Sequence, residues 1–342
     1  MRKLLTLAKL PLLWLPESAV ARLLKGRLRV VDGRQIDPKA QLFGEMVETI
    51  RAGADPVVEE SRAQMSRMAS LLDEPCPTGV LKSDIQLPGV DGLCPARMYT
   101  PPGATGAMPT LLFLHGGGWI QCDLDTHDGL CGKLADWAGI KVISFHYRLA
   151  PEHKFPAGLD DVSAAYHAVL QQADSLGVDP ARIAVGGDSA GANLTAALMH
   201  VLQESGAPLP KAQLLLYPAL DGRLNTPSVK SLTDAFLLNH DRMLWYLSLY
   251  LADGQDPLDP RVSPMLSDRL AGQPQALVVV AGHDPLRDDG TNYADRLKAV
   301  GTQAEVIEYP GQIHAFMSMT KILPQGNDAI RTSAEWLRAA LT

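Results

Sequence analysis

The chain has 342 residues, of which 46% are apolar and 20% are charged, and its formal net charge is −7 at pH 7. This is the composition of a soluble globular protein with material for one large domain or two smaller ones. The acidic balance argues against general nucleic-acid binding. No apolar stretch reaches membrane-spanning length without a charge or a proline.

The cysteines predict neither a structural zinc site nor a redox motif, because none of them has C-x-x-C spacing. A chain of this length needs no disulfide framework, which suits a reducing cytoplasm. A periplasmic or membrane-associated location is left open. The four residues are Cys76, Cys94, Cys122 and Cys131.

Residues 1–34 form a basic segment that differs from the rest of the chain, with a net charge of +6 and many leucines. Our first interpretation of this segment is a cap over the mouth of an active site. The second is a basic amphipathic helix that lies on a membrane surface. A signal peptide ranks third, because Lys9, Pro11 and Pro16 interrupt the apolar stretch that it requires. The basic residues are Arg2, Lys3, Lys9, Arg22, Lys25, Arg27, Arg29 and Arg34.

The next region, residues 35–72, is predicted to be helical, because its apolar residues recur at helix-like intervals. These residues are Leu42, Met46, Ile50, Met65, Met68 and Leu72. Proline and glycine at positions 75–79 end the region. Segments 84–87 and 96–99 then alternate around a Pro-Gly and Asp-Gly turn, which predicts an antiparallel hairpin.

Six continuous apolar runs follow, as expected for parallel strands that are buried on both faces. They lie at 110–114, 141–145, 182–185, 213–217, 276–281 and 304–309, with helical stretches such as 159–172, 193–203 and 293–300 between them. With the hairpin, they predict an α/β fold with a mostly parallel, eight-stranded sheet and helices on both faces. The gap between 217 and 276 is too long for an ordinary crossover, so we expect a helical cap insertion at about 222–262.

Ser189 lies at the centre of the sequence G-D-S-A-G, directly after an apolar strand and before a helical stretch. A serine on such a strand-turn-helix is exposed and oriented for nucleophilic attack. Gly187 and Gly191 stand where a β-carbon would collide with the neighbouring strand and helix. The pattern predicts a nucleophile, whereas the alternative is an ordinary small-residue turn.

The loop after strand 110–114 reads His-Gly-Gly-Gly-Trp at residues 115–119. Its three successive glycines leave backbone N–H groups uncovered, so this loop, beside the N–H of Ala190, is predicted to form an oxyanion hole. A phosphate-binding loop is disfavoured, because the Lys-Ser/Thr ending of a P-loop is missing. His115 is interpreted as structural.

His314 follows the last predicted strand and is the candidate general base for Ser189. Asp284 follows strand 276–281 and is the candidate carboxylate that orients this histidine. Asp288 and Asp289 are rivals, but they fall where the next helix begins and where acidic residues complement its dipole. His283 is disfavoured by its adjacency to Asp284, and Asp188 is expected to hold the serine turn through a structural hydrogen bond.

These motifs resemble the hormone-sensitive-lipase-like (bacterial family IV) branch of the α/β-hydrolases. The matching pieces span roughly residues 80–342 and lie at 115–119, 147–152, 155–157, 187–191, 284–288 and 309–314. The resemblance implies Ser189, His314 and Asp284 as a catalytic triad. It also implies an oxyanion hole formed by the N–H groups of Gly117, Gly118 and Ala190, and a helical cap built from the N-terminus and the later insertion. We therefore divide the chain into a cap segment, 1–75, and an α/β-hydrolase catalytic domain, 76–342.

The expected activity is a serine carboxylesterase for short- to medium-chain acyl esters, without a metal or cofactor. The alternatives are a deacetylase or amidase for a specialised small molecule, and a catalytically silent ligand-binding protein, which the retained His314 disfavours. Candidate pocket residues are Trp119, Leu237, Leu238 and Phe316. The expected partner is a small-molecule ester, with no nucleic acid. A homodimer is left open, and membrane contact through the basic segment is a minority hypothesis.

Overall fold

The computed structural model describes residues 10–51 and 57–342 of the chain. Residues 1–9 and 52–56 lie outside the described residues, and so do Arg2, Lys3 and Lys9 of the basic segment. Within the described ranges, no helix is long and apolar enough to cross a membrane.

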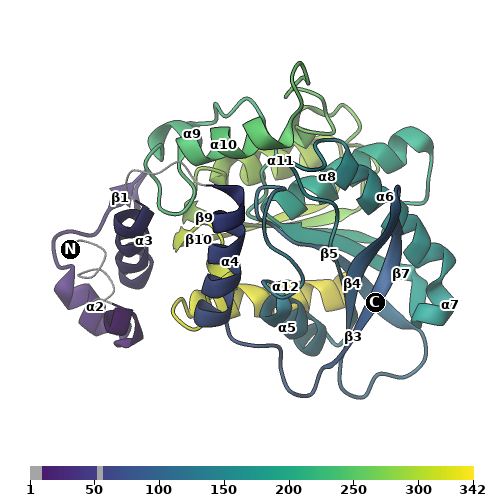
Figure 1. Cartoon of the computed structure of the whole chain (residues 1–342), viewed down its shortest axis with the longest axis horizontal. Coiled ribbons are helices and arrows are strands. Elements are labelled where there is room, and N and C mark those ends of the chain that lie inside the picture. Colours follow the sequence, from purple (N-terminus) through teal and green to yellow (C-terminus); the bar gives the residue numbers. More distant parts are fainter. Residues whose placement is uncertain (1–9, 52–56) are drawn as a thin grey trace.

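Eight strands form one sheet, which lies at the centre of the molecule (Figure 1). Their order in the sheet is β10-β9-β8-β7-β5-β6-β4-β3. β3 and β4 form an antiparallel hairpin, β4 pairs with β6 in antiparallel fashion, and the remaining neighbours are parallel. The prediction of a mostly parallel, eight-stranded sheet is therefore confirmed. The strands are β3 (Leu81–Gly89), β4 (Gly92–Thr100), β5 (Met108–Leu114), β6 (Lys141–Phe145), β7 (Val178–Asp188), β8 (Ala212–Leu216), β9 (Gln275–His283) and β10 (Ala304–Ile313).

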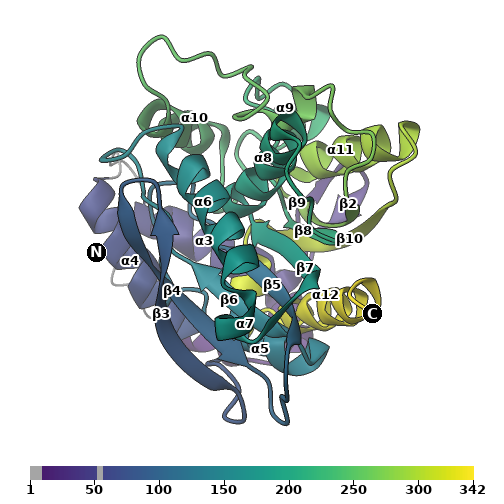
Figure 2. The ribbon, with the colours of Figure 1, turned by 90° about the vertical axis from the view of Figure 1, so that its right-hand side faces the viewer.

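Helices cover both faces of the sheet because successive strand residues face opposite sides. In β5, Leu111 and Phe113 pack in one core with α5 and α12, whereas Leu112 and Leu114 pack in the other with α6 and α8. Figure 2 shows α12 and α5 below the sheet and α6 and α8 above it. The helices of these layers are α5 (Asp128–Ala138), α6 (Ala157–Gln171), α7 (Ala173–Leu176), α8 (Ala190–Ser205), α11 (Arg287–Ala299) and α12 (Gln325–Ala340).

The N-terminal region contains more than the expected helices. A two-stranded hairpin precedes them, and the helical stretch begins at Pro38 rather than at residue 35, because residues 30–35 pair with each other. This hairpin lies beside β10. The elements are η1 (Leu10–Trp14), α2 (Glu17–Leu23), β1 (Val30–Val31), β2 (Arg34–Gln35), α3 (Pro38–Arg51) and α4 (Val58–Leu72).

The segment between β8 and β9 is helical near its centre, where α9 (Pro227–Ser231) and α10 (His240–Tyr250) form. The Asn239 side chain caps α10 by accepting a hydrogen bond from the N–H of Arg242. The two remaining elements are short 3₁₀ turns, η2 (Pro264–Leu266) and η3 (Phe316–Ser318). Figure 1 shows α9 and α10 along the upper side of the molecule, with α2 and α3 at its left.

Candidate active site

Ser189 stands at the turn from β7 into α8, with φ of 52° and ψ of −113°. Non-glycine residues rarely adopt a positive φ, so the surrounding structure must hold this strained conformation. The Ser189 N–H donates to the carbonyl oxygen of Leu216, 2.8 Å away in β8. A β-carbon on Gly187 or Gly191 would lie 2.3 Å or 1.9 Å from the Leu114 carbonyl oxygen. These two positions therefore need glycine for the turn to fit against β5.

The structure brings His314 and Asp284 to Ser189 from the ends of the last two strands. The Nε2 atom of His314 lies 3.0 Å from the Ser189 Oγ, and its Nδ1 atom lies 2.7 Å from the Asp284 Oδ2. An ionised carboxylate only accepts hydrogen bonds, so Nδ1 carries the proton and Nε2 is free to accept the serine proton. The N–H of Leu286 donates to the other oxygen of Asp284, 2.9 Å away, which fixes the carboxylate.

Gly117 and Gly118 lie in the loop after β5 and line the same cavity as Ser189 and Ala190. Their φ values of 108° and 62° leave the loop in a conformation that side chains disfavour. The N–H of Ala190 is in the first turn of α8, where it has no partner within the helix. In the part of the chain that the structure describes, no hydrogen bond leaves the N–H of Gly117 or Gly118.

Asp188 ties the glycine loop to the serine turn, which matches the structural role expected for it. One of its oxygens accepts from the Gly116 N–H at 2.7 Å and lies 2.9 Å from the Nε2 of His127. Burial disfavours a charge on His127, but the adjacent Asp188 outweighs it, so the pKa of His127 is raised. His115 is fully buried, and its Nε2 lies 2.9 Å from the Nδ1 of His146.

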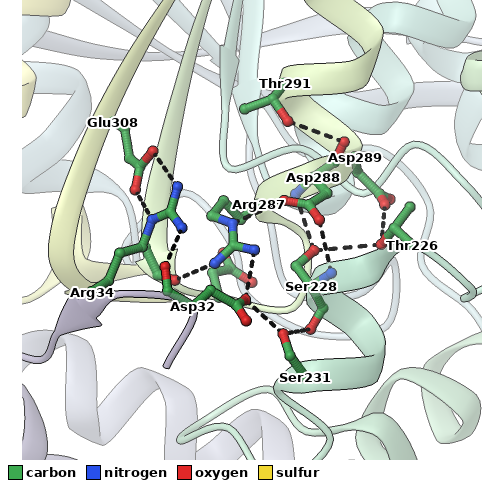
Figure 3. Close-up of polar contacts among 12 residues, drawn as sticks. Asp32, Arg34, Thr226, Ser228, Ser231, Arg287, Asp288, Asp289, Thr291 and Glu308 are labelled. Atoms are coloured by element: carbon green, nitrogen blue, oxygen red, sulfur yellow. Dashed lines mark hydrogen bonds and ion pairs between the residues drawn. The ribbon is translucent and has the colours of Figure 1, made fainter. Parts of the chain in front are cut away.

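The loop that carries Asp284 is held by the buried guanidinium of Arg287 (Figure 3). Arg287 donates to the Gly282 carbonyl oxygen at 3.1 Å, to Asp288 at 2.9 Å and to Asp32 at 2.9 Å. Asp32 comes from the turn between β1 and β2, so the N-terminal hairpin contacts the loop of the candidate acid. These contacts fix the backbone on both sides of Asp284.

The rival acids begin α11, as expected, and bind elsewhere. Asp288 accepts from the Ser228 N–H at 2.8 Å, and Asp289 accepts from the Leu220 N–H at 3.0 Å. Burial raises the pKa of Asp289 to about 8. His283 ends β9, and burial lowers its pKa to about 4. Neither aspartate is hydrogen-bonded to His314 among the described residues.

Above Ser189 lies a mainly apolar cavity of about 170 Å³. Trp119, Leu237 and Leu238 line it. Phe316 does not, which corrects the expectation from the sequence: it is fully buried, with its ring packed against Tyr217 and Tyr309. The η3 turn directs this side chain into the core and leaves its neighbour Ala315 at the cavity.

The cavity wall also includes residues that the sequence reading did not assign to the site. They come from α3, α4 and α10 and include Phe43, Val47, Met65, Met68, Leu72, Met243 and Tyr246. Apolar residues recur at helix-like intervals in these segments of the sequence. This periodicity does not show whether the apolar face of the helix packs against the core or lines a cavity. Among the described residues, no group of three or more His, Cys, Asp or Glu side chains is arranged to hold a metal ion.

The model of a protein family described as the α/β-hydrolase fold matches residues 111–318. A carboxylic ester hydrolase, LipN, of Mycobacterium tuberculosis is 41% identical over 322 residues, covering 90% of this chain and 84% of that protein. An ethyl acetate hydrolase of Pseudomonas putida is 33% identical, covering 90% and 99%. The chain belongs to the hormone-sensitive-lipase-like branch of the α/β hydrolases.

Solved structures of other α/β hydrolases agree with this assignment. A thermostable carboxylesterase, EstE1, from a metagenomic library is 37% identical with a TM-score of 0.79, and the match covers 84% of this chain and 98% of that one. An ester hydrolase from the Lake Arreo metagenome is 35% identical with a TM-score of 0.85, covering 89% and 98%.

This α/β hydrolase departs from the family pattern at two small residues. Ala192 stands where many members have glycine, and it is fully buried in the core beside Leu215. Ala315 follows His314 where glycine is common, and its φ of 60° lies in the region that favours glycine. Both positions hold only one extra methyl group, and neither disturbs the hydrogen bonds of His314.

Proposed function

We propose that this carboxylic ester hydrolase uses Ser189 as nucleophile, His314 as general base and Asp284 as the carboxylate that orients it. One observation carries the proposal: the hydrogen-bonded series from Ser189 Oγ to His314 (3.0 Å) and on to Asp284 (2.7 Å) opens into an apolar cavity. A serine hydroxyl becomes an effective nucleophile when such a base accepts its proton.

The reaction would proceed through an acyl-enzyme. The Ser189 Oγ attacks the ester carbonyl carbon while the Nε2 of His314 takes the hydroxyl proton. Asp284 keeps Nδ1 protonated and stabilises the imidazolium that forms. His314 then gives its proton to the leaving alcohol oxygen. A water molecule, deprotonated by the same nitrogen, attacks the acyl-enzyme, and collapse of the second tetrahedral intermediate returns the proton to Ser189.

The negative oxygen of the tetrahedral intermediates would be held by the N–H groups of Gly117, Gly118 and Ala190. Support comes from their place at the cavity beside Ser189 and from the two glycine N–H groups, which have no hydrogen-bond acceptor among the described residues. One such donor typically contributes about 10²–10³ in rate. The N-terminus of α8 adds a favourable dipole at the same point.

We propose esters of short- to medium-chain acids as substrates. The cavity is mainly apolar, and its apolar wall comes largely from α3, α4 and α10. The relative from Pseudomonas putida is named for ethyl acetate, an ester with a two-carbon acyl group. An apolar wall gains affinity with each buried methylene until the cavity is filled.

The assignment is tested by replacing Ser189 with alanine and measuring hydrolysis of p-nitrophenyl butyrate. We expect turnover to fall to the background rate while the circular dichroism spectrum stays unchanged. Ser66→Ala is the matched control, because Ser66 is exposed on α4 and donates only to the Arg62 carbonyl oxygen.

A fluorophosphonate label gives a second, independent readout. It should modify the wild-type protein and Ser66→Ala at Ser189 and leave Ser189→Ala unmodified. Retained turnover in Ser189→Ala would exclude the mechanism. Failure of the label and of ester turnover in the wild-type protein would instead favour a ligand-binding role.

A further inference from the structure

The peptide bond between Gly117 and Gly118 is fixed from one side. Its carbonyl oxygen accepts from the N–H of Ile120 at 3.3 Å and from the N–H of Gln121 at 3.2 Å. Because a trans peptide is planar, the N–H of Gly118 must point the opposite way, away from Gln121. The direction of this N–H is therefore set by where the backbone of Gln121 lies.

The side chain of Gln121 is buried and is held at both of its polar atoms. Its Oε1 accepts from the Ser61 hydroxyl at 2.5 Å, and its Nε2 donates to the Tyr246 hydroxyl at 2.8 Å. Ser61 belongs to α4 in the N-terminal segment, and Tyr246 belongs to α10 in the later insertion. A single amide thus joins the glycine loop to both helical segments that line the cavity.

Two further contacts close this arrangement. The Tyr246 ring packs on Gly118 so closely that a β-carbon there would lie 2.1 Å from the ring. Arg242, one turn earlier in α10, donates to the Ser61 Oγ at 2.9 Å and lies with its guanidinium carbon 5.2 Å from the Tyr246 ring centroid. The two helical segments are therefore also bonded to each other at this point.

We propose that Gln121 is a positioning residue, which couples the orientation of the Gly117–Gly118 amides to the docking of α4 and α10 through Ser61 and Tyr246. The inference rests on the proposed function, in which these amides hold the oxyanion. Preorganised donors accelerate a reaction because they need no rearrangement when the negative charge develops. A loosened Gln121 should weaken binding of the transition state more than binding of the substrate.

The test uses Tyr246→Phe, which removes the hydroxyl that Gln121 contacts and keeps the ring on Gly118. Ser61→Ala breaks the other contact independently. We expect each to lower kcat about 3- to 10-fold on p-nitrophenyl butyrate, with KM changed less than about twofold. The matched control is Ser248→Ala, because Ser248 is exposed on α10 and donates only to the Trp245 carbonyl oxygen.

Two inhibitors separate positioning from a general structural role. A trifluoromethyl ketone forms a tetrahedral oxyanion with the serine, whereas an amide analogue of the substrate resembles the ground state. In both variants we expect the affinity for the ketone to fall by the same factor as kcat and the affinity for the amide to stay within about twofold. The double variant should lose less than the product of the two single effects, because both act through one side chain.

The outcomes distinguish this inference from the proposed function. Unchanged kcat and ketone affinity in both variants would overturn the positioning role while leaving Ser189 as the nucleophile. An equal loss of affinity for ketone and amide, or a rise in KM that accounts for the whole effect, would also overturn it. Absence of turnover in the wild-type protein would overturn the proposed function itself.

Discussion

Asp32 accepts a hydrogen bond from Arg287 at 2.9 Å, across a separation of 255 residues. The same oxygen of Asp32 accepts from the Ser231 hydroxyl at 2.7 Å (Figure 3). These bonds lower the pKa of Asp32, with Ser231 the larger cause and Arg287 the next. One carboxylate therefore joins the N-terminal hairpin, the α9 helix and the loop that carries Asp284.

Asp32→Ala should destabilise the protein, because it leaves the buried Arg287 guanidinium without one of its acceptors. We expect the free energy of unfolding to fall by about 1–2 kcal/mol, at the low end for a charged pair since Asp32 is partly exposed. Urea denaturation followed by tryptophan fluorescence measures it. Asp125→Ala is the control, because the Asp125 side chain is 81% exposed in its pair with Arg97. Equal losses in the two variants would contradict the prediction.

Gly118→Ala should impair catalysis through a clash with Tyr246. The new methyl group would overlap the Tyr246 ring and displace the glycine loop, lowering kcat/KM by about 10²-fold, as for a lost oxyanion donor. In a Tyr246→Ala background the clash is removed, and only the strain of alanine at positive φ remains, about 1–2 kcal/mol. We therefore expect a smaller effect of Gly118→Ala in that background. An identical factor in both backgrounds would show that Tyr246 does not limit this position.

His283 should make the protein less stable as the pH falls. Burial lowers its pKa to about 4 in the folded state, against about 6.5 in the unfolded chain. Between these values the unfolded chain binds a proton that the folded one does not, so this contribution to stability is present above about pH 6.5 and is lost on acidification. His283→Gln should reduce the pH dependence of the free energy of unfolding over this window. A steeper slope in His283→Gln would refute the sign.

Met68→Trp should shorten the longest acyl chain that the site accepts, because Met68 lines the cavity from α4. We expect kcat/KM for p-nitrophenyl octanoate to fall about 10-fold or more and that for the acetate to change less than about threefold. Leu71→Trp is the matched control on the exposed face of the same helix. If Leu71→Trp has the same effect, α4 does not bound the acyl site.

Most of the sheet was predictable because buried parallel strands leave continuous apolar runs. The apolar runs at 110–114 and 141–145 correspond to β5 and β6, and their bounds differ from those of the observed strands by at most two residues. The hairpin at residues 30–35 gave no such signal, since each of its strands is two residues long, with one residue exposed and the other partly buried. Its place is set by distant contacts, among them the hydrogen bond that Arg287 donates to Asp32.

The candidate site likewise contains residues that the sequence predicts and residues that only the structure reveals. Ser189, His314 and Asp284 could be named from the sequence because each follows a strand, and parallel strands end at one edge of a sheet. Phe316 was misplaced because sequence position gives no side-chain direction in a 3₁₀ turn. Gln121 carried no local signal of importance, since its role depends on partners 60 and 125 residues away.

The sequence by itself determined the succession of strands and helices along the chain, the serine turn and the residue types that its chemistry needs, because these depend on local periodicity and on steric limits within a few residues. Only the tertiary structure decided which side chains bound the cavity and which hydrogen bonds hold the Gly117–Gly118 amides. Those features arise where α4 and α10, which are far apart in the chain, come together beside the glycine loop. Their contacts are selected by packing, which no short stretch of sequence encodes.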